Sequence, residues 1–313
     1  MITYLSHHVN IKPFLVYVIF WYTQLMKEVF IGFDVGGTNI VGGLISKQGK
    51  ILSSQSHPTQ NNLGKKQIAR NVIKIAEGLL GDNFKCIGIG LGWPSTVNIC
   101  LSDKEIKVIL EKKFKVPVFF DNDANLFAYS EALIGQAKKY SVVVGVTLGT
   151  GLGCGLIVDK KIYHGKGGAS EFGHVSINLD GPKCACGSTG CFEEYAGSRA
   201  IRRLATKYKL GDKDGQVLSK LAKQGDKKAM KLWEEFGKQI GPGMVSIINA
   251  YDPEIIILGG QISGAWEFFH QSMNKEIKQR ALLEPPVIKV SKLHNATIIG
   301  AGLLAKEESH VII

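Results

Sequence analysis

Apolar positions along the chain form two kinds of pattern. Short runs rich in Val and Ile end at a turn, as in Glu28–Asp34, which is typical of buried strands. Longer stretches place apolar residues three or four positions apart, as in Ile68, Val72, Ile75 and Leu79, which is typical of helices. Because the two patterns alternate, the sequence predicts an α/β fold. The predicted strands are 28–34, 40–45, 84–91, 116–121, 141–148, 153–158 and 254–258, and the predicted helices are 64–80, 102–114, 123–135, 198–209, 227–250 and one from about 297.

A glycine-rich hairpin opens each half of the chain. At an offset of 113 residues, Gly36 matches Gly149, and Gly42 matches Gly155. In each half the glycines separate two apolar stretches, which is the pattern of a tight turn between antiparallel strands. The repeat is short, but it predicts two related α/β halves.

Composition and charge narrow the class of protein. The chain has 313 residues, of which 45% are hydrophobic and 21% charged, which is typical of a globular protein large enough for two cores. A formal net charge of +11 is compatible with nucleic acid, a membrane surface or a small anion as partner. The chain lacks blocks of five or six like charges. We therefore expect no nucleic-acid partner, and we interpret the lysines as solvated helix faces.

The first 25 residues differ from the rest. They contain one charged residue, Lys12, and an apolar run over 14–22. A membrane-spanning helix needs about 20 apolar residues, so this run is too short, and no cleavage site of small residues follows it. We interpret residues 1–25 as an extension outside the fold, arising from a misplaced start, with a peripheral membrane anchor as the alternative. The prediction is therefore no membrane partner.

Both hairpins are candidate phosphate-binding loops. Glycines allow backbone N–H groups to approach phosphate oxygens, and hydroxyl and amide side chains add donors. Either hairpin alone can be a plain turn, but the presence of two favours phosphate binding, and neither is a Walker A loop. A carboxylate before the first hairpin can hold a metal-bound water. The candidate residues are Asp34, Gly36, Gly37, Thr38 and Asn39 in the first loop, and Thr147, Gly149, Thr150 and Gly151 in the second.

The pair Asn122-Asp123 follows a predicted strand and opens a helix. A carboxylate at this place can cap the helix. It can also act as a general base, because α/β sheets bind ligands at the carboxyl ends of their strands. The residues alone leave both interpretations open.

Four potential metal ligands form the densest cluster of reactive side chains. His174, Cys184, Cys186 and Cys191 provide the Cys3His set of a tetrahedral zinc site. A chain without an export signal uses such cysteines for metal binding rather than disulfides, which predicts a cytoplasmic protein. With four protein ligands the zinc would be structural. Glu171 and Glu193 flank the set and are expected to be free to accept hydrogen bonds from a polyol.

Three further glycine pairs mark close approaches of the backbone. They are candidates for an adenosine pocket, but each can equally serve helix–strand packing. These segments are Gly241–Gly243, Gly259-Gly260-Gln261 and Gly300–Gly302.

Together the motifs resemble the ROK family, which contains bacterial and archaeal sugar kinases and sugar-responsive repressors. The resemblance extends from about residue 28 to 305 and is most specific in the cysteine-rich run. The matching segments are Asp34–Asn39, Asn122-Asp123, Leu148–Gly151, Glu171–His174 and Cys184–Glu193.

The resemblance implies a two-domain actin-like (ribonuclease H-like) fold. We expect a small domain of residues 26–121 plus about 300–313, and a large domain of residues 122–299 that contains the zinc loop. It also implies a homodimer and ATP-dependent phosphorylation of a hexose 6-hydroxyl, with Mg²⁺ bridging the β- and γ-phosphates. Glucose is the expected sugar, and an N-acetylhexosamine is the alternative.

By the same resemblance, Asp123 is the general base, and the glycine hairpins, with Gly259 and Gly260, bind ATP. The sugar hydroxyls would be bound by Asn122, Asp123, Glu171, His174 and Glu193.

One segment departs from the family pattern. Between Pro94 and Ser102 the chain is shorter than in kinases of this family, and the Asn that binds sugar there is absent. One wall of the sugar pocket is therefore expected to be short, and a sugar-binding protein without catalysis is a further alternative. A repressor is disfavoured, because residues 1–25 lack the basic helices of a DNA-binding module.

Overall fold

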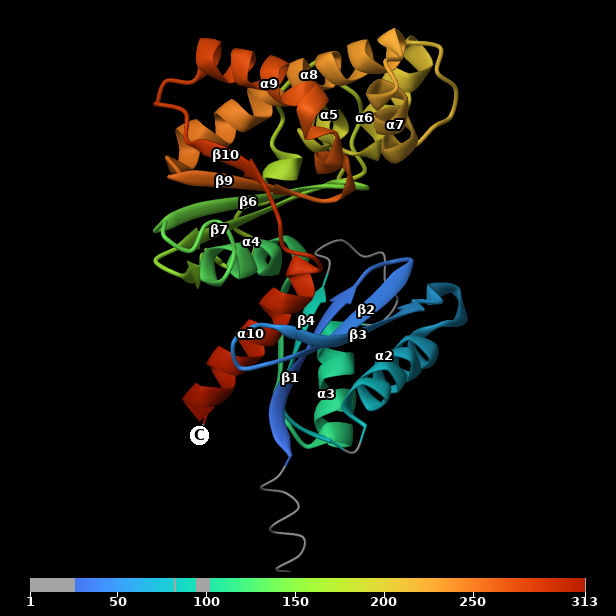
Figure 1. Cartoon of the computed structure of the whole chain (residues 1–313), viewed down its shortest axis with the longest axis vertical. Coiled ribbons are helices and arrows are strands. Elements are labelled where there is room, and N and C mark those ends of the chain that lie inside the picture. Colours follow the sequence, from blue (N-terminus) through green and yellow to red (C-terminus); the bar gives the residue numbers. More distant parts are fainter. Residues whose placement is uncertain (1–25, 82, 94–101, 313) are drawn as a thin grey trace, which may run out of the picture.

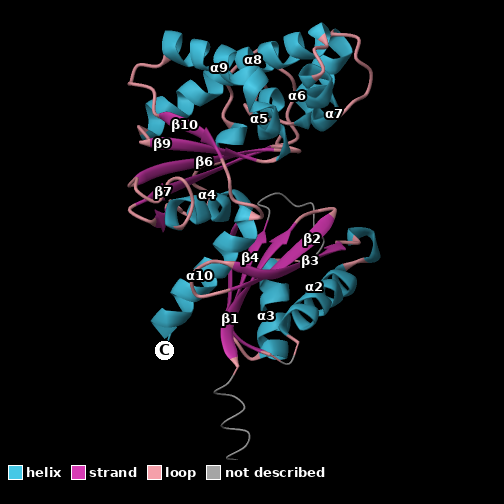
Figure 2. Ribbon diagram, in the orientation of Figure 1, coloured by secondary structure: helices cyan, strands magenta, loops and turns pink. Residues whose placement is uncertain are grey.

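The computed structural model describes residues 26–81, 83–93 and 102–312, and it contains two five-stranded sheets (Figures 1 and 2). The first sheet has the order β3-β2-β1-β4-β5, and the second has the order β10-β9-β6-β7-β8. The strands of the first sheet are β1 (Lys27–Val35), β2 (Asn39–Ile45), β3 (Ile51–Pro58), β4 (Phe84–Trp93) and β5 (Val118–Asn122), and those of the second are β6 (Val142–Leu148), β7 (Leu152–Val158), β8 (Lys161–Ile162), β9 (Ile255–Gly259) and β10 (Val287–Val290).

The two sheets have the same topology. In each, the first three strands are antiparallel neighbours, and the last two run parallel to the first strand. The predicted duplication is therefore confirmed at the level of topology, and the two hairpins occupy equivalent places. The predicted α/β class is also confirmed.

Helices cover the faces of both sheets. In the first half, α2 and α3 cover one face of the sheet and α10 the other, while α4 packs on β6 and β7 of the second sheet and also contacts α10 (Figure 1). The helices α5 to α9 lie on the far side of the second sheet. The helices are α2 (Lys65–Leu80), α3 (Asp103–Phe114), α4 (Asp123–Leu133), α5 (Glu193–Ala196), α6 (Ser198–Lys207), α7 (Gly215–Lys223), α8 (Lys227–Tyr251), α9 (Trp266–Arg280) and α10 (Ala296–Ile312).

Alternation along β1 explains why both faces of the first sheet are covered. Val29, Ile31 and Phe33 point into the core shared with α2 and α3, whereas Phe30 packs with Ala305 of α10 on the opposite face. Side chains of successive strand residues point to opposite faces, so an unbroken apolar strand requires a cover on each side.

Glycines at equivalent strand positions seat one helix on each sheet. A Cβ on Gly32 of β1 would lie 2.0 Å from the carbonyl oxygen of Ile298 in α10, and a Cβ on Gly145 of β6 would lie 2.6 Å from Ala128 Cβ in α4. Neither site has room for a side chain. The absence of Cβ atoms therefore lets α10 and α4 lie directly on their strands.

Most of the predicted elements are confirmed, including the capping box of α3. There Glu105 N donates to Ser102 Oγ at 3.3 Å, and Ser102 N donates to a Glu105 carboxylate oxygen at 3.0 Å. The strands β3 and β10 and the helices α7 and α9 were not predicted. Strand β3 is polar because it is an exposed edge strand, so its sequence lacks the apolar signal.

Two predictions fall partly or wholly outside the described residues. They are the extension over 1–25 and the shortened segment after Pro94, most of which lies within 94–101. The division into a small and a large domain, and the homodimer, stay predictions. Among the described helices, none is both long and apolar enough to cross a membrane.

Candidate active site

The two glycine hairpins lie at the turns between β1 and β2 and between β6 and β7. In the first, Gly36 N donates to Asn39 O at 3.0 Å, and in the second, Gly149 N donates to Gly151 O at 3.0 Å. Thr38, Asn39 and Thr150 are exposed. A Cβ on Gly149 would meet no atom within 4 Å, so this turn borders open space. Both predicted phosphate loops are thus tight turns with accessible polar groups.

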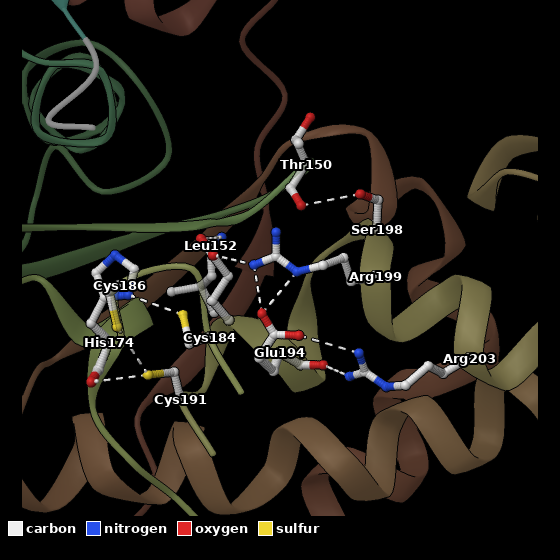
Figure 3. A network of polar contacts seen from close by, with 11 residues as sticks. Thr150, Leu152, His174, Cys184, Cys186, Cys191, Glu194, Ser198, Arg199 and Arg203 are labelled. Atoms are coloured by element: carbon white, nitrogen blue, oxygen red, sulfur yellow. Dashed lines mark hydrogen bonds and ion pairs between the residues drawn. The ribbon is translucent and has the colours of Figure 1, made fainter. Parts of the chain in front are cut away.

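Neighbouring segments hold each turn from behind. In the first half, the Thr59 hydroxyl donates to Gly36 O at 2.5 Å. In the second half, Ser198 at the start of α6 donates from its N–H to Gly149 O at 3.0 Å and from its hydroxyl to Thr150 O at 3.1 Å. The second turn is therefore tied to α6 (Figure 3).

Two carboxylates lie close together at the ends of β1 and β5. Burial and the nearby charge of Asp123 raise the pKa of Asp34 to about 7. Burial also raises the pKa of Asp123, with a smaller contribution from the charge of Glu171, while a hydrogen bond from Ala124 N opposes the shift. The charges of Asp34, Asp123 and Glu171 thus act on one another, which joins residues predicted separately from three segments.

Asn122 resolves the two interpretations of the segment that opens α4. Asn122, not Asp123, is the N-cap: its side-chain oxygen accepts from Ala124 N at 2.8 Å and from Asn125 N at 3.3 Å. Asp123 is the first residue of the helix. Since the cap is supplied by its neighbour, Asp123 is not required for capping.

The predicted metal ligands converge. The ligand atoms of His174, Cys184, Cys186 and Cys191 all lie within 4.8 Å of one another. His174 Nδ1 is 3.7 Å from Cys184 Sγ, and Cys186 Sγ is 3.6 Å from Cys191 Sγ (Figure 3). Ligands about 2.0–2.3 Å from a tetrahedral ion lie roughly 3.5–3.8 Å apart, so the arrangement fits a zinc ion. The cluster can therefore hold a metal ion on Nδ1 of His174.

Glycines close the loop around this cluster. Gly187 and Gly190 have φ values of 93° and 67°, a left-handed conformation that favours glycine. A Cβ on Gly190 would also lie only 1.6 Å from Asn178 O. The loop is closed by backbone hydrogen bonds, among them Cys184 N to Ser188 O at 2.8 Å.

Glu193 is already held by two protein donors, and its binding of a polyol stays a prediction. One of its carboxylate oxygens accepts from Arg199 Nη2 at 2.7 Å, and the other accepts from Leu152 N at 3.2 Å. Arg199 also bonds Glu194, which is only 3% exposed and pairs with Arg203 (Figure 3). Glu193 has oxygen lone pairs left to accept further hydrogen bonds, but its orientation is already fixed. The arginines carry no motif that the sequence analysis could have used.

Glu171 lies at the end of a loop that leads from β8 to the metal cluster. The residue before it, Ser170, has a φ of 69°, so the chain turns sharply there. After Glu171, a short 3₁₀ turn (Phe172–His174) carries the histidine ligand. Glu171 and His174 are therefore placed by one turn of the chain.

A pocket of about 540 Å³ opens beside the second hairpin. It differs from the expected adenosine pocket in most of its lining. Only Gln261 comes from the predicted glycine segments. The residues that line it are Gly149, Thr150, Ser198, Ile201, Arg202, Lys213, Asp214, Gly215, Gln216, Gln261 and Ile262.

The predicted glycine segments lie at close approaches of helices and strands. A Cβ on Gly259 would lie 2.5 Å from the Phe127 ring, and one on Gly260 would lie 2.2 Å from Leu148 O. The other two segments behave alike: a Cβ on Gly243 would lie 2.3 Å from the Phe192 ring, and one on Gly300 would lie 2.0 Å from Leu126 O. These glycines bring helices and strands together, and their part in ATP binding stays a prediction.

Comparison with known proteins identifies relatives over nearly the whole chain. The model of the ROK family matches residues 30–308. A glucokinase of Streptomyces coelicolor is 32% identical over 317 residues, covering 90% of this chain and 99% of the relative. A xylose repressor of Bacillus spizizenii is also 32% identical, over 267 residues that cover 80% of this chain and 68% of the repressor.

The fold is also similar to solved structures. A ROK family glucokinase of Streptomyces griseus, solved in complex with glucose and AMPPNP, has a TM-score of 0.78 and 29% identity. The match covers 89% of this chain and 99% of that one. Such kinases have the actin-like ATPase fold, so the predicted fold class is confirmed.

Proposed function

This chain belongs to the ROK family, and from this premise we propose that it is a sugar kinase that transfers the γ-phosphoryl group of ATP to the 6-hydroxyl of a hexose, with glucose as the first candidate. One observation carries the proposal. Asp123, a carboxylate with a raised pKa that is not needed as a cap, lies among the charges of Asp34, beside a hairpin, and Glu171, beside the metal cluster. This is the place where a sugar hydroxyl and a phosphate would meet.

Asp123 acts as the general base. As the sugar oxygen attacks the γ-phosphorus, the hydroxyl proton passes to the Asp123 carboxylate, the new O–P bond forms, and the bond to the β-phosphate oxygen breaks with release of ADP. Burial raises the pKa of Asp123, which makes its carboxylate a stronger base than an exposed one.

The remaining site residues orient the sugar. Glu171 and Glu193 would accept hydrogen bonds from sugar hydroxyls, and Arg199 and Leu152 N hold the second of these carboxylates in place. His174 would bind the ion through Nδ1, the atom that faces Cys184, and offer Nε2 to the sugar. A zinc ion there, when bound, would fix the histidine ring and close the loop.

The phosphate side of the site is formed by the two hairpins. Backbone N–H groups around Gly37, Thr38 and Thr150 would contact the ATP phosphates, and the pocket beside Thr150 would receive the nucleoside. Mg²⁺, when bound to ATP, supplies charge neutralisation of the phosphates, and Asp34 is positioned to hold one of its waters.

A kinase is favoured over a repressor by the extent of the matches. The glucokinase of Streptomyces coelicolor is covered over 99% of its length, whereas the xylose repressor is covered over 68%. The match to the repressor nevertheless covers 80% of this chain, so similarity does not separate the two activities. Catalysis therefore has to be tested directly.

The test is ADP release by the full chain with MgATP and a panel of glucose, mannose, N-acetylglucosamine, N-acetylmannosamine and fructose. We expect turnover with one sugar, and a loss of kcat of roughly 10²–10⁴ in Asp123→Asn, as removal of a general base produces. Asp252→Asn, at an exposed carboxylate with a φ of 44° that Asn tolerates, is the matched control. Equal turnover in Asp123→Asn and wild type would contradict the assignment of the base.

A further inference from the structure

Asp121, two residues before Asp123, has a carboxylate that the proposed reaction does not use. It is only 5% exposed, and three donors surround it. One of its oxygens accepts from Asn122 N and from Asn125 Nδ2, each at 2.8 Å. The other lies 2.6 Å from His164 Nε2. A buried carboxylate with this many partners holds its surroundings firmly.

His164 belongs to the opposite side of the site. It lies in the loop that follows β8 of the second sheet, whereas Asp121 lies in β5 of the first sheet. The loop folds back on His164, because His164 O accepts from Gly167 N at 2.7 Å and from Ala169 N at 3.1 Å. Two residues beyond Ala169, the same loop ends at Glu171.

The contact is therefore a link between two parts of the site. On one side, Asp121 bonds the backbone of Asn122, next to Asp123. On the other, His164 anchors a loop whose glycines Gly165 and Gly167 have φ values of 56° and 116°, a conformation that favours glycine. Residues 163–168 are exposed, so before it reaches the buried Ser170 the loop gains little rigidity from its own packing apart from the contact of His164.

We propose that the contact between Asp121 and His164 is a latch that positions Glu171 relative to Asp123. Asp121 and His164 are positioning residues, and neither touches the substrate. The latch persists in both charge states of the imidazole, because a protonated ring and a neutral ring with its hydrogen on Nε2 each donate to the carboxylate. The inference deepens the proposed function and rests on it for the role of Glu171.

The first test separates the latch from a general structural role by steady-state kinetics. His164→Ala is expected to raise KM for the sugar about tenfold, the size of effect that loss of one charge-assisted hydrogen bond produces. KM for ATP should stay within about twofold of wild type, because the hairpins are untouched. His164→Gln, whose amide nitrogen replaces Nε2, should restore KM for the sugar to within about threefold of wild type.

His294→Ala is the matched control, because His294 is exposed and lies before α10. It should have wild-type kinetics. Equal KM for the sugar in His164→Ala and wild type would overturn the latch. So would a parallel rise in both KM values, since that result indicates a general loss of structure.

The second test needs no turnover. Amide hydrogen exchange of the ligand-free chain should be faster over residues 165–171 in His164→Ala and in Asp121→Ala, and close to wild type in His164→Gln. If the wild-type chain phosphorylates none of the sugars, the proposed function fails, and exchange alone decides on the latch. Faster exchange in both alanine variants supports it, and unchanged exchange overturns it.

Discussion

The two halves of the molecule share one sheet topology and differ in what is inserted into it. In the first half, a single helix, α2, and a short 3₁₀ turn lie between the antiparallel strands and β4. In the second, the corresponding connection from β8 to β9 contains Glu171, the metal cluster and most of the residues that line the pocket. It also contains the arginine network, in which Arg199 and Arg203 bond Glu193 and Glu194. The two halves thus share equivalent turns, and the insertion in the second half supplies most of the side chains that we propose for sugar and nucleoside.

The turns themselves differ in a second respect. Asp34 precedes the first hairpin, and at the equivalent position before the second hairpin stands Thr147. The first turn therefore has a carboxylate beside it, whereas the second is bonded to α6 by Ser198. The two turns are thus equivalent in backbone and different in side-chain chemistry. Four predictions test this difference between the two halves, in order of decreasing effect.

The largest expected effect on stability concerns the metal cluster, which lies in the insertion of the second half. We expect purified wild-type protein to contain one zinc per chain and Cys191→Ser to contain none. The free energy of unfolding of Cys191→Ser should be lower by about 4 kcal/mol, because a structural ion stabilises the fold that binds it. Metal analysis and thermal unfolding with and without a chelator measure both. Cys86→Ser, at a half-buried cysteine of the first half, should keep the metal. Wild-type protein without zinc would contradict the prediction.

Next, matching glycines should differ in their tolerance of a methyl group. A Cβ on Gly155 would lie 2.6 Å from the backbone oxygen of Ala124, whereas one on the equivalent Gly42 would lie 2.5 Å from a side-chain atom, Cγ2 of Ile75. A side chain can change its rotamer more easily than helix backbone can move. We expect Gly155→Ala to cost about 3 kcal/mol of unfolding free energy and Gly42→Ala about 1 kcal/mol. Equal losses in denaturant unfolding would argue against different packing of the two halves.

A smaller effect concerns pH and only the first half. The pKa of Asp34 is about 7 in the folded protein and 3.8 in the unfolded chain, so the folded state binds the proton more tightly. Stability from this group therefore falls as the pH rises from about 4 to about 7. Asp34→Asn should abolish this fall and be more stable than wild type by a few kcal/mol at pH 8, with no difference near pH 4.

Denaturant unfolding between pH 4 and pH 8 measures the difference between Asp34→Asn and wild type. Thr147→Val, at the equivalent residue of the second half, should show the pH dependence of wild type, since it removes no titrating group. A constant difference between Asp34→Asn and wild type across this range would rule out the raised pKa as its cause.

The smallest effect concerns the arginine network of the insertion. Arg199→Met leaves Glu194 with Arg203, so we expect a loss of only about 1 kcal/mol of stability, since the guanidinium is 40% exposed. KM for the sugar should rise severalfold, because Glu193 loses the bond that orients it. Arg199→Lys keeps the charge but cannot bond Glu193 and Glu194 at once. Its stability and its KM for the sugar should therefore lie between those of wild type and Arg199→Met. Unchanged KM in Arg199→Met would show that Leu152 N alone orients Glu193.

The sequence predicted the duplicated elements because their signals are local. Apolar runs that end in glycine identified both hairpins, and the capping box at Ser102 identified the start of α3. Helix α9 was missed although it carries a local signal, because its buried apolar residues Phe269, Met273 and Ile277 lie four positions apart, the spacing of a helix. Strand β3 was not predicted because an exposed edge strand needs no apolar face, and its sequence is mostly polar.

The site was predictable where residue types alone decide the chemistry. The Cys3His set could be identified from spacing, since few other functions need those residues so close together. The contacts of Glu193 with Arg199 and of Asp121 with His164 could not, because each depends on how separate elements meet in space. The pocket lining was not predicted for the same reason, because α6 and α7 lie beside the second hairpin only in the folded chain.

The seating of α10 on Gly32 has a consequence for the order of events during synthesis. The ribosome releases β1 and its neighbours early, but in the described part of the chain the helix that packs along β1 on one face of that sheet is α10, which contains residues 296–312. Until α10 emerges, Phe30 and Ile45 have no cover on that face. The half of the protein that is made first is thus the half that is finished last, and a chaperone would meet its uncovered side throughout translation.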